Sequence, residues 1–273
     1  MKKIVLTAVC AAFSITLMAQ EAASDKKVQL GLAYQTGMNF NKPGTKIIER
    51  DGVGATNSIG VNMNLSFNQN IGLMLGLEFD FESFKYNVVT TDRLYYDYID
   101  SKILKKEDTE TGSTLFNLQH RKQKAVYGTI PVMLLFRTNM IGSFRYYGKF
   151  GARTGILLSS MATDEGFTFA GNDPLGTQIA MTNSDMKTKS DLFPFRSSIG
   201  LAAGAEWNFT GNTSLFAELG FYYGFTRVHY GEAITGDDRE RDMSLYQMSS
   251  GTADYTTFSS KQKQIVLKVG ILF

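Results

Sequence analysis

Apolar and polar residues alternate with a period of two along most of this chain. From Ile59 to Phe67 apolar residues occupy every odd position, with small or polar residues between them. After the turn-rich tripeptide Asn68–Asn70 the alternation resumes from Ile71 to Glu82. A period of two predicts a β-strand with one apolar and one polar face. Two such strands joined by a short turn predict a hairpin.

Six further segments repeat this alternation, so we expect eight strands. The eight segments are 28–35, 59–67, 71–82, 126–137, 146–158, 197–209, 215–225 and 264–273. Three links between them are short, at 68–70, 138–144 and 210–213, and four are long and polar, at about 38–57, 87–123, 160–193 and 229–256. Short and long links occur in strict alternation. This predicts an up-and-down barrel with one plain rim and one elaborate rim.

The polar face carries acids and bases in nearly equal number. The expected lumen charge network consists of Glu78, Asp80, Glu82, Lys149, Arg153, Arg196, Glu206, Glu218 and Lys268, and Arg137 and Arg227 share the same face. Four glycine pairs spaced four apart interrupt this face, at 72/76, 151/155, 200/204 and 220/224. The interior of an eight-stranded barrel is just wide enough to be filled by side chains. We therefore expect the charges to pair and close the interior, with the glycines making room. The alternative is an ion path.

Aromatic residues gather at the two ends of the apolar face. They are Phe67, Phe136, Tyr146, Trp207, Phe209 and Phe273 near the short links, and Tyr34, Phe79, Phe81, Tyr223 and Phe225 near the long ones. Aromatic girdles around an aliphatic band are typical of a barrel that crosses a membrane. The predicted fold is all-β, an eight-stranded antiparallel up-and-down transmembrane β-barrel. A soluble barrel is the alternative.

The N-terminus has the features of a signal peptide. Lys2 and Lys3 precede an apolar run from Ile4 to Leu17, and Ala19 is a small residue at the expected cleavage position, which predicts a signal peptide over 1–19 and a barrel over 20–273. The alternatives are a membrane anchor and a lipoprotein attached through Cys10, the single cysteine. The mean hydropathy of −0.13 suits a soluble protein. It is also the average expected from an apolar outer face, a charged interior and polar loops.

The signal peptide, the eight amphipathic strands, the strand around Ile130–Val132 and the C-terminal segment resemble the small outer-membrane β-barrel proteins of Gram-negative bacteria. This group includes the PorT-like family and the transmembrane domains of OmpX- and OmpA-type proteins. The resemblance implies a location in the outer membrane, contact with lipid and lipopolysaccharide, and insertion by the barrel-assembly machinery. The residues that match the assembly signal are Ile265, Leu267, Val269, Ile271 and Phe273. Unlike in the OmpA type, no peptidoglycan-binding domain is expected after Phe273.

Few residues suggest chemistry. The chain has two histidines, His120 and His229, both expected to be solvated in long loops. A role for His229 with Asp237 or Asp238 in acid–base catalysis is the alternative. The run Asp237–Asp242 could bind calcium, although its arginines favour a self-compensating surface. The run Lys102–Lys106 could contact lipopolysaccharide, or be a solvated loop. No cofactor, metal site or nucleic-acid partner is expected.

These features predict a non-enzymatic outer-membrane protein with a closed lumen and long surface loops for interaction or structural roles. The tyrosines expected to contact a surface partner are Tyr95, Tyr96, Tyr98, Tyr230, Tyr246 and Tyr255. The alternative that the resemblance suggests is an accessory subunit of a secretion or envelope complex. An outer-membrane hydrolase or acyltransferase is a third hypothesis.

Overall fold

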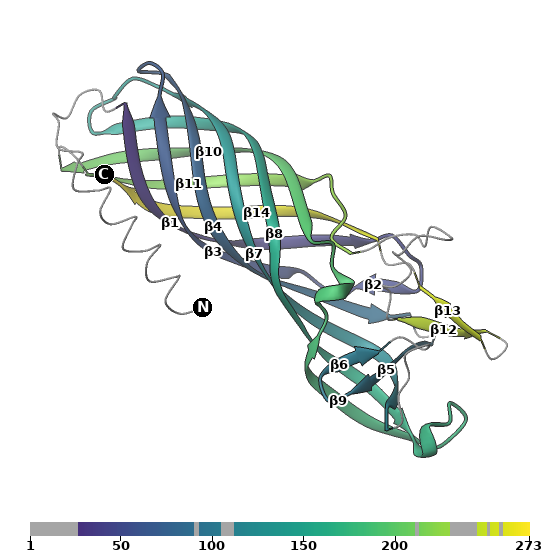
Figure 1. Cartoon of the computed structure of the whole chain (residues 1–273). Coiled ribbons are helices and arrows are strands. Elements are labelled where there is room, and N and C mark those ends of the chain that lie inside the picture. Colours follow the sequence, from purple (N-terminus) through teal and green to yellow (C-terminus); the bar gives the residue numbers. More distant parts are fainter. Residues whose placement is uncertain are drawn as a thin grey trace.

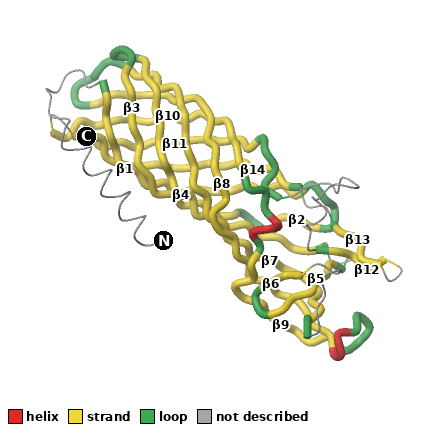
Figure 2. Tube along the Cα trace, in the orientation of Figure 1, coloured by secondary structure: helices red, strands yellow, loops and turns green. Residues whose placement is uncertain are grey.

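The computed structural model describes residues 27–89, 93–104, 112–210, 213–229, 245–249, 252–256 and 259–273. The predicted signal peptide, the run 237–242 and Tyr230 lie outside these residues. Strands dominate the described part of the chain, and only short single-turn helices interrupt them (Figure 2). No helix within the described ranges is long and apolar enough to cross a membrane.

Eight long strands form a closed ring. They are β1 (Val28–Pro43), β3 (Gly54–Ser66), β4 (Ile71–Val88), β7 (Thr114–Arg137), β8 (Phe144–Phe169), β10 (Phe195–Thr210), β11 (Thr213–Gly224) and β14 (Ser260–Leu272). Each pairs antiparallel with the next in this order, and β14 pairs with β1. Figure 1 shows them as a cylinder of tilted strands.

Alternation along each ring strand separates an apolar outer surface from a polar interior. On β14, Leu267 and Val269 are 50% and 43% exposed, whereas Val266 and Lys268 between them are each 1% exposed. All of the aromatic residues predicted to bracket the outer face are exposed on it. We call the exposed apolar residues between these two aromatic rims the apolar belt. The phase of alternation that was read from the sequence therefore assigns the two faces of the ring.

Six shorter strands occupy segments that were expected to be irregular loops. They are β2 (Ile48–Arg50), β5 (Leu94–Ile99), β6 (Lys102–Leu104), β9 (Gln178–Lys187), β12 (Tyr246–Ser249) and β13 (Thr252–Tyr255). The all-β prediction is confirmed, but the described residues form fourteen strands instead of eight. The predicted long loops 38–57, 87–123, 160–193 and 229–256 also contain the extended ends of β1, β4, β7 and β8. Backbone pairing continues beyond the apolar belt, so these strands are longer than the segments in which apolar and polar residues alternate.

Three of the short strands close a second, smaller ring at the elaborate end. β7 pairs with β5, β5 with β6, β6 with β9 and β9 with β8, which returns to β7. We call β5, β6, β9, Thr114–Leu118 of β7 and Met161–Phe169 of β8 the lobe; it projects from one end of the cylinder (Figure 1). Tyr96 and Phe116, which are both fully buried, pack in its core.

The opposite rim is plain, as predicted. In the link between β3 and β4 the Asn68 side chain accepts hydrogen bonds from the backbone N–H groups of Asn70 and Ile71, at 2.9 and 2.7 Å. Such a side-chain acceptor replaces the backbone partners that a tight turn cannot supply. The ring therefore has one short-turn rim, and the lobe lies at the other end.

Candidate functional site

Three carboxylates at alternate positions of β4 form the centre of the ring's interior. Arg153 on β8 donates from Nη2 to Glu78 Oε2 at 2.7 Å and to Asp80 Oδ1 at 3.1 Å. Lys268 on β14 donates from Nζ to the other oxygen of Glu78 at 2.6 Å. None of these four side chains is more than 3% exposed. Because their strands lie on different sides of the ring, the ion pairs bridge the interior.

Arg196 on β10 extends this arrangement towards the lobe. Its guanidinium donates to Asp80 Oδ2 at 2.7 Å and also to Glu82. Gln262 and Gln264 of β14 donate to the two oxygens of Glu82, at 2.8 and 2.7 Å. Buried charges are tolerated when they are both paired and hydrogen-bonded, and this condition holds for each of the three acids.

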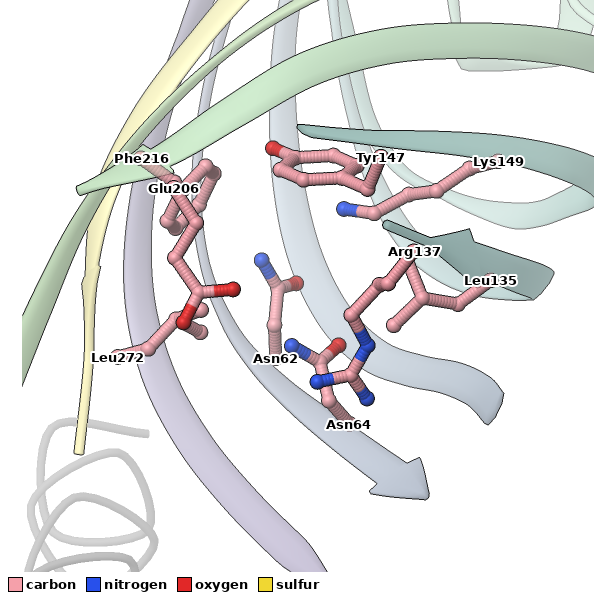
Figure 3. Close-up of a pocket in the computed structure, with 9 residues that line it drawn as sticks. All are labelled: Asn62, Asn64, Leu135, Arg137, Tyr147, Lys149, Glu206, Phe216 and Leu272. Carbon is pink, nitrogen blue, oxygen red and sulfur yellow. The ribbon is translucent and has the colours of Figure 1, made fainter. Parts of the chain in front are cut away.

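A separate ion pair lies nearer the short-turn rim. Lys149 Nζ donates to Glu218 Oε2 at 2.6 Å, and the two side chains are 5% and 1% exposed. Glu206 has no ion-pair partner among the described residues. It lies instead at a narrow cavity in which its carboxylate and the Arg137 guanidinium are directed towards the same space (Figure 3). The remaining residues that line the cavity are Asn62, Asn64, Leu135, Tyr147, Lys149, Phe216 and Leu272.

Tyrosine rings, which were not among the residues expected in the network, pack against the buried cations. The Arg153 guanidinium lies 4.8 Å from the Tyr222 ring centroid, and that of Arg196 lies 4.2 Å from the Tyr127 centroid. Each arrangement has the geometry of a cation–π contact. Tyr127 and Tyr222 lie on the inward phase of their strands, so that alternation was the signal that could have identified them.

Some interior glycines make room for tyrosine rings, whereas a Cβ atom at Gly72 would lie 3.3 Å from the Arg137 guanidinium. A Cβ atom at Gly200 would lie 2.3 Å from the Tyr222 ring, and one at Gly204 would lie 2.7 Å from the Tyr147 hydroxyl oxygen. These glycines were expected to accommodate paired charges. At these two positions the bulky neighbours are instead tyrosines.

His229 is buried, which corrects the expectation of a solvated loop residue. It is 2% exposed and lies just beyond the apolar belt. Its Nδ1 is 2.8 Å from Ser260 Oγ, and its Nε2 is 3.0 Å from Gln123 Oε1. Burial, together with nearby Arg121, lowers the pKa of His229 to about 3, so the ring is neutral at pH 7. The other histidine, His120, is partly buried.

A second polar cluster stabilises the base of the lobe. Arg121 forms a bidentate ion pair with Asp164, with both nitrogen–oxygen distances 2.8 Å, and donates to Asp191 at 3.0 Å. The Tyr96 hydroxyl donates to Asp164 at 2.9 Å. Burial and the neighbouring Asp164 raise the pKa of Tyr96, so the hydroxyl keeps its proton. This cluster joins β5, β7 and β8 where the lobe begins.

Several residues expected at the surface are buried. Tyr95, Tyr96, Tyr98 and Tyr246 are each no more than 9% exposed, because Tyr96 packs against Tyr98 in the core of the lobe and Tyr95 stacks on Tyr246 of β12. They are therefore not available as contacts for a partner. The Tyr255 side chain lies outside the described part of the structure.

Two other expectations concern basic residues. Arg227, expected on the inward face, is exposed beyond the end of β11. Lys102 is exposed on the lobe, whereas Lys105 and Lys106 fall outside the described ranges. Among the described residues no group of His, Cys, Asp or Glu could hold a metal ion.

The residues expected to form the assembly signal all point outward. Ile265, Leu267, Val269, Ile271 and Phe273 are 37–50% exposed and alternate with buried residues on the last strand. Their role in assembly remains a prediction.

A closed ring with an apolar belt, aromatic rims and an ion-paired interior is the architecture of an outer-membrane β-barrel protein. A family model described as "Outer membrane protein beta-barrel domain" matches residues 18–230, and the chain belongs to this family. This membership confirms the resemblance noted in the sequence and implies a location in the outer membrane. No curated protein sequence matches the chain.

Several solved structures are similar to most of the chain at low identity. The attachment invasion locus protein Ail of Yersinia pestis is 11% identical, with a TM-score of 0.34, covering 91% of this chain and 100% of its own. The outer membrane protease OmpT of Escherichia coli is 12% identical, with a TM-score of 0.41 and coverage of 93% and 99%. OprG of Pseudomonas aeruginosa is 10% identical, with a TM-score of 0.38 and coverage of 92% and 98%.

Proposed function

We propose that this protein is a non-enzymatic outer-membrane barrel that is closed to ions and holds the lobe at the cell surface for contact with a partner. In this proposal the eight-strand ring spans the membrane, and residues 1–19 are a cleaved signal peptide. Residues 20–273 form the barrel and its lobe. The charge network closes the lumen. The barrel-assembly machinery inserts the protein, which then contacts lipopolysaccharide in the outer membrane.

The observation that carries the closed lumen is the set of ion pairs across the ring. Arg153, Arg196 and Lys268 balance the three carboxylates of β4 at nitrogen–oxygen distances of 3.1 Å or less. An ion that entered would have to separate these pairs in a space already filled by side chains. The network therefore supports a structural plug over an ion path.

The lobe supports a role at the surface. Outer-membrane barrels have short periplasmic turns and longer external connections, so the lobe is expected outside. On the hairpin of β8 and β9 it exposes Leu175, Ile179 and Met181, which are 91%, 54% and 43% exposed. Ile179 and Met181 share one face of β9, and exposed apolar side chains outside the apolar belt favour contact with another molecule.

Conductance across a planar lipid bilayer tests the closed lumen. The refolded protein should give no steps above the baseline of the membrane, whereas the double variant Arg196→Ser, Glu82→Ser should conduct, because it opens the network without leaving an unpaired charge. The double variant Lys102→Ser, Lys187→Ser on the lobe is the control and should behave as the wild type. Regular conductance steps from the wild-type protein would contradict the proposal.

Crosslinking in intact cells tests the surface role. A photo-crosslinking residue at position 179 should capture a macromolecule in a stoichiometric complex, whereas one at position 267 in the apolar belt should capture lipid. If the captured molecules are subunits of a secretion complex, the accessory role replaces the surface role. If position 179 captures nothing in cells that display the protein, the lobe is not a contact surface.

A further inference from the structure

Six lysines lie on the outer surface of the ring just beyond the apolar belt, on the lobe side. They are Lys42 on β1, Lys85 on β4, Lys122 and Lys124 on β7, and Lys261 and Lys263 on β14. On β14 the outward residue next to Lys263 is Ile265, and on β7 the outward residue next to Lys124 is Val126. Lys42, Lys85, Lys124 and Lys263 are therefore the first outward-facing charges that their strands carry beyond the belt.

The six lysines form two triads with the same arrangement. Lys42 is directly opposite Lys261 in the pairing of β1 with β14, and Lys85 is directly opposite Lys122 in the pairing of β4 with β7. The third member follows two residues along the strand, on the same face. We call these sets the β1/β14 triad and the β4/β7 triad. Directly opposed like charges destabilise a sheet, and this arrangement occurs twice in one ring.

None of the six lysines has an ion-pair partner among the described residues. Lys263 Nζ lies 5.8 Å from the ring centroid of Tyr223, an aromatic residue at the edge of the belt. The nearby acids are Glu49 on β2, Asp51, whose backbone N–H donates to the Lys85 carbonyl oxygen at 3.0 Å, and Glu165 on β8, which is directly opposite His120. These acids lie beside the β4/β7 triad, so the six lysines keep an excess of positive charge that is greatest at the β1/β14 triad.

The triads belong to a wider basic rim. Beyond the end of β3, β2 lies between the two triads with Glu49 and Arg50 exposed, and the Arg50 guanidinium lies 5.7 Å from the Phe40 ring centroid. On the other side of the ring, Arg227 is exposed beyond β11, and Lys187 of β9 lies across β8 from Lys124. The triads are therefore the places on this rim where lysines of two neighbouring ring strands face each other.

We propose that the two lysine triads bind the phosphate groups of anionic glycolipid in the outer leaflet. This inference rests on the proposed membrane-spanning ring, which puts the triads at the level of the headgroups. A phosphate between two opposed ammonium groups turns their repulsion into attraction, and basic residues at an anionic membrane surface each strengthen binding. The run Lys102–Lys106, which the sequence suggested for this contact, begins on the lobe instead of at the belt.

The test compares two double variants in vesicles of phosphatidylcholine, with and without purified lipid A. Lys42→Gln with Lys261→Gln removes the opposed pair of the β1/β14 triad. Lys46→Gln with Lys102→Gln is the control, because both lysines are exposed and neither belongs to a triad. Both variants lose two exposed charges, but only the belt variant loses an opposed pair at the edge of the belt.

Lipid A should bind the wild type and the control equally, and the belt variant about 30-fold more weakly, since each basic residue contributes roughly fivefold. Lipid A should also reverse the order of stability of the belt variant and the wild type. In phosphatidylcholine alone the belt variant should resist urea at least as well as the wild type, because repulsion is relieved. With lipid A present, the wild type should become the more resistant of the two.

Three outcomes would overturn the inference. The control could lose as much binding as the belt variant, lipid A could fail to raise the resistance of the wild type to urea, or inorganic phosphate without lipid A could raise that resistance equally. Equal loss in the control would mean unspecific attraction, and an effect of free phosphate would mean a site for soluble anions. Insertion into phosphatidylcholine vesicles is measured separately. If the wild-type protein inserts but does not bind lipid A, only the proposed role of the triads is refuted. If it fails to insert, the proposed membrane-spanning ring is refuted.

Discussion

The ion pair between Lys149 and Glu218 allows the energetics of the barrel interior to be measured. It is the simplest pair of the lumen, because each side chain has one ion-pair partner, at 2.6 Å. We consider the single variants Lys149→Met and Glu218→Met, and the double variant that carries both. Methionine approximately preserves the length and volume of both side chains, so the cycle changes charge more than packing.

The expected magnitudes follow from burial. Removing one member leaves the other as an uncompensated charge that is at most 6% exposed, which costs about 3–5 kcal/mol. Lys149 also lines the cavity near the short-turn rim, where water can approach, so the lower end of this range applies. Replacing both members with apolar residues leaves no buried charge and is expected to cost about 1 kcal/mol or less. The coupling free energy is therefore several kcal/mol.

The free energy of unfolding is measured by urea titration in phosphatidylcholine vesicles. Trp207 is the only tryptophan and lies on the outer surface, so its emission reports departure from lipid. The double variant should be more stable than either single variant. If the losses of stability in the two single variants add up to the loss in the double variant, or if each single loss is below about 1 kcal/mol, the pair is hydrated and the lumen is not closed at this level.

Two further predictions concern buried groups. The pKa of His229 is lowered from 6.5 to about 3 in the folded protein, so the unfolded state binds the extra proton and stability falls as the pH drops below 6.5. Between pH 7 and pH 5 the free energy of unfolding should fall by about 2 kcal/mol through this group. In urea titrations at the two pH values, His229→Gln should abolish that part of the pH dependence. An unchanged pH dependence in the variant would contradict the neutral buried ring. Gly200→Ala should destabilise by about 1–3 kcal/mol through overpacking against Tyr222. Gly148→Ala, whose Cβ atom would meet nothing closer than 3.9 Å, should be nearly neutral, and equal urea midpoints for the two variants would refute the packing argument.

The faces of the ring could be predicted because both of its environments leave a signal of period two. Glu78, Asp80 and Glu82 alternate with Leu77, Phe79 and Phe81, so the strand and its orientation are readable from one short segment. The acids also indicate the kind of interior, since unpaired charges would be too costly to bury. Their individual partners could not be read, because Arg153, Arg196 and Lys268 come from three strands far apart in sequence.

The lobe could not be predicted because its strands lose this signal. Leu115, Phe116, Asn117 and Leu118 are consecutive and all buried, since β7 is covered on both faces there. A strand buried on both faces shows no alternation, and its polar residues resemble those of a loop. His229 illustrates a second limit. Its partners Gln123 and Ser260 lie 106 and 31 residues away, so its burial depends on contacts that no local pattern reveals.

The most direct test of the central claim is the side of the membrane on which each end of the ring is exposed. Single cysteines are introduced by Lys187→Cys on the lobe and Asn139→Cys in the short link between β7 and β8, in a background with Cys10→Ala. Both positions are exposed in the structure. A maleimide that cannot cross the outer membrane should label position 187 in intact cells, and position 139 only after the outer membrane is permeabilised. Labelling of position 139 in intact cells, or protection of position 187, would contradict a membrane-spanning ring with its lobe at the cell surface.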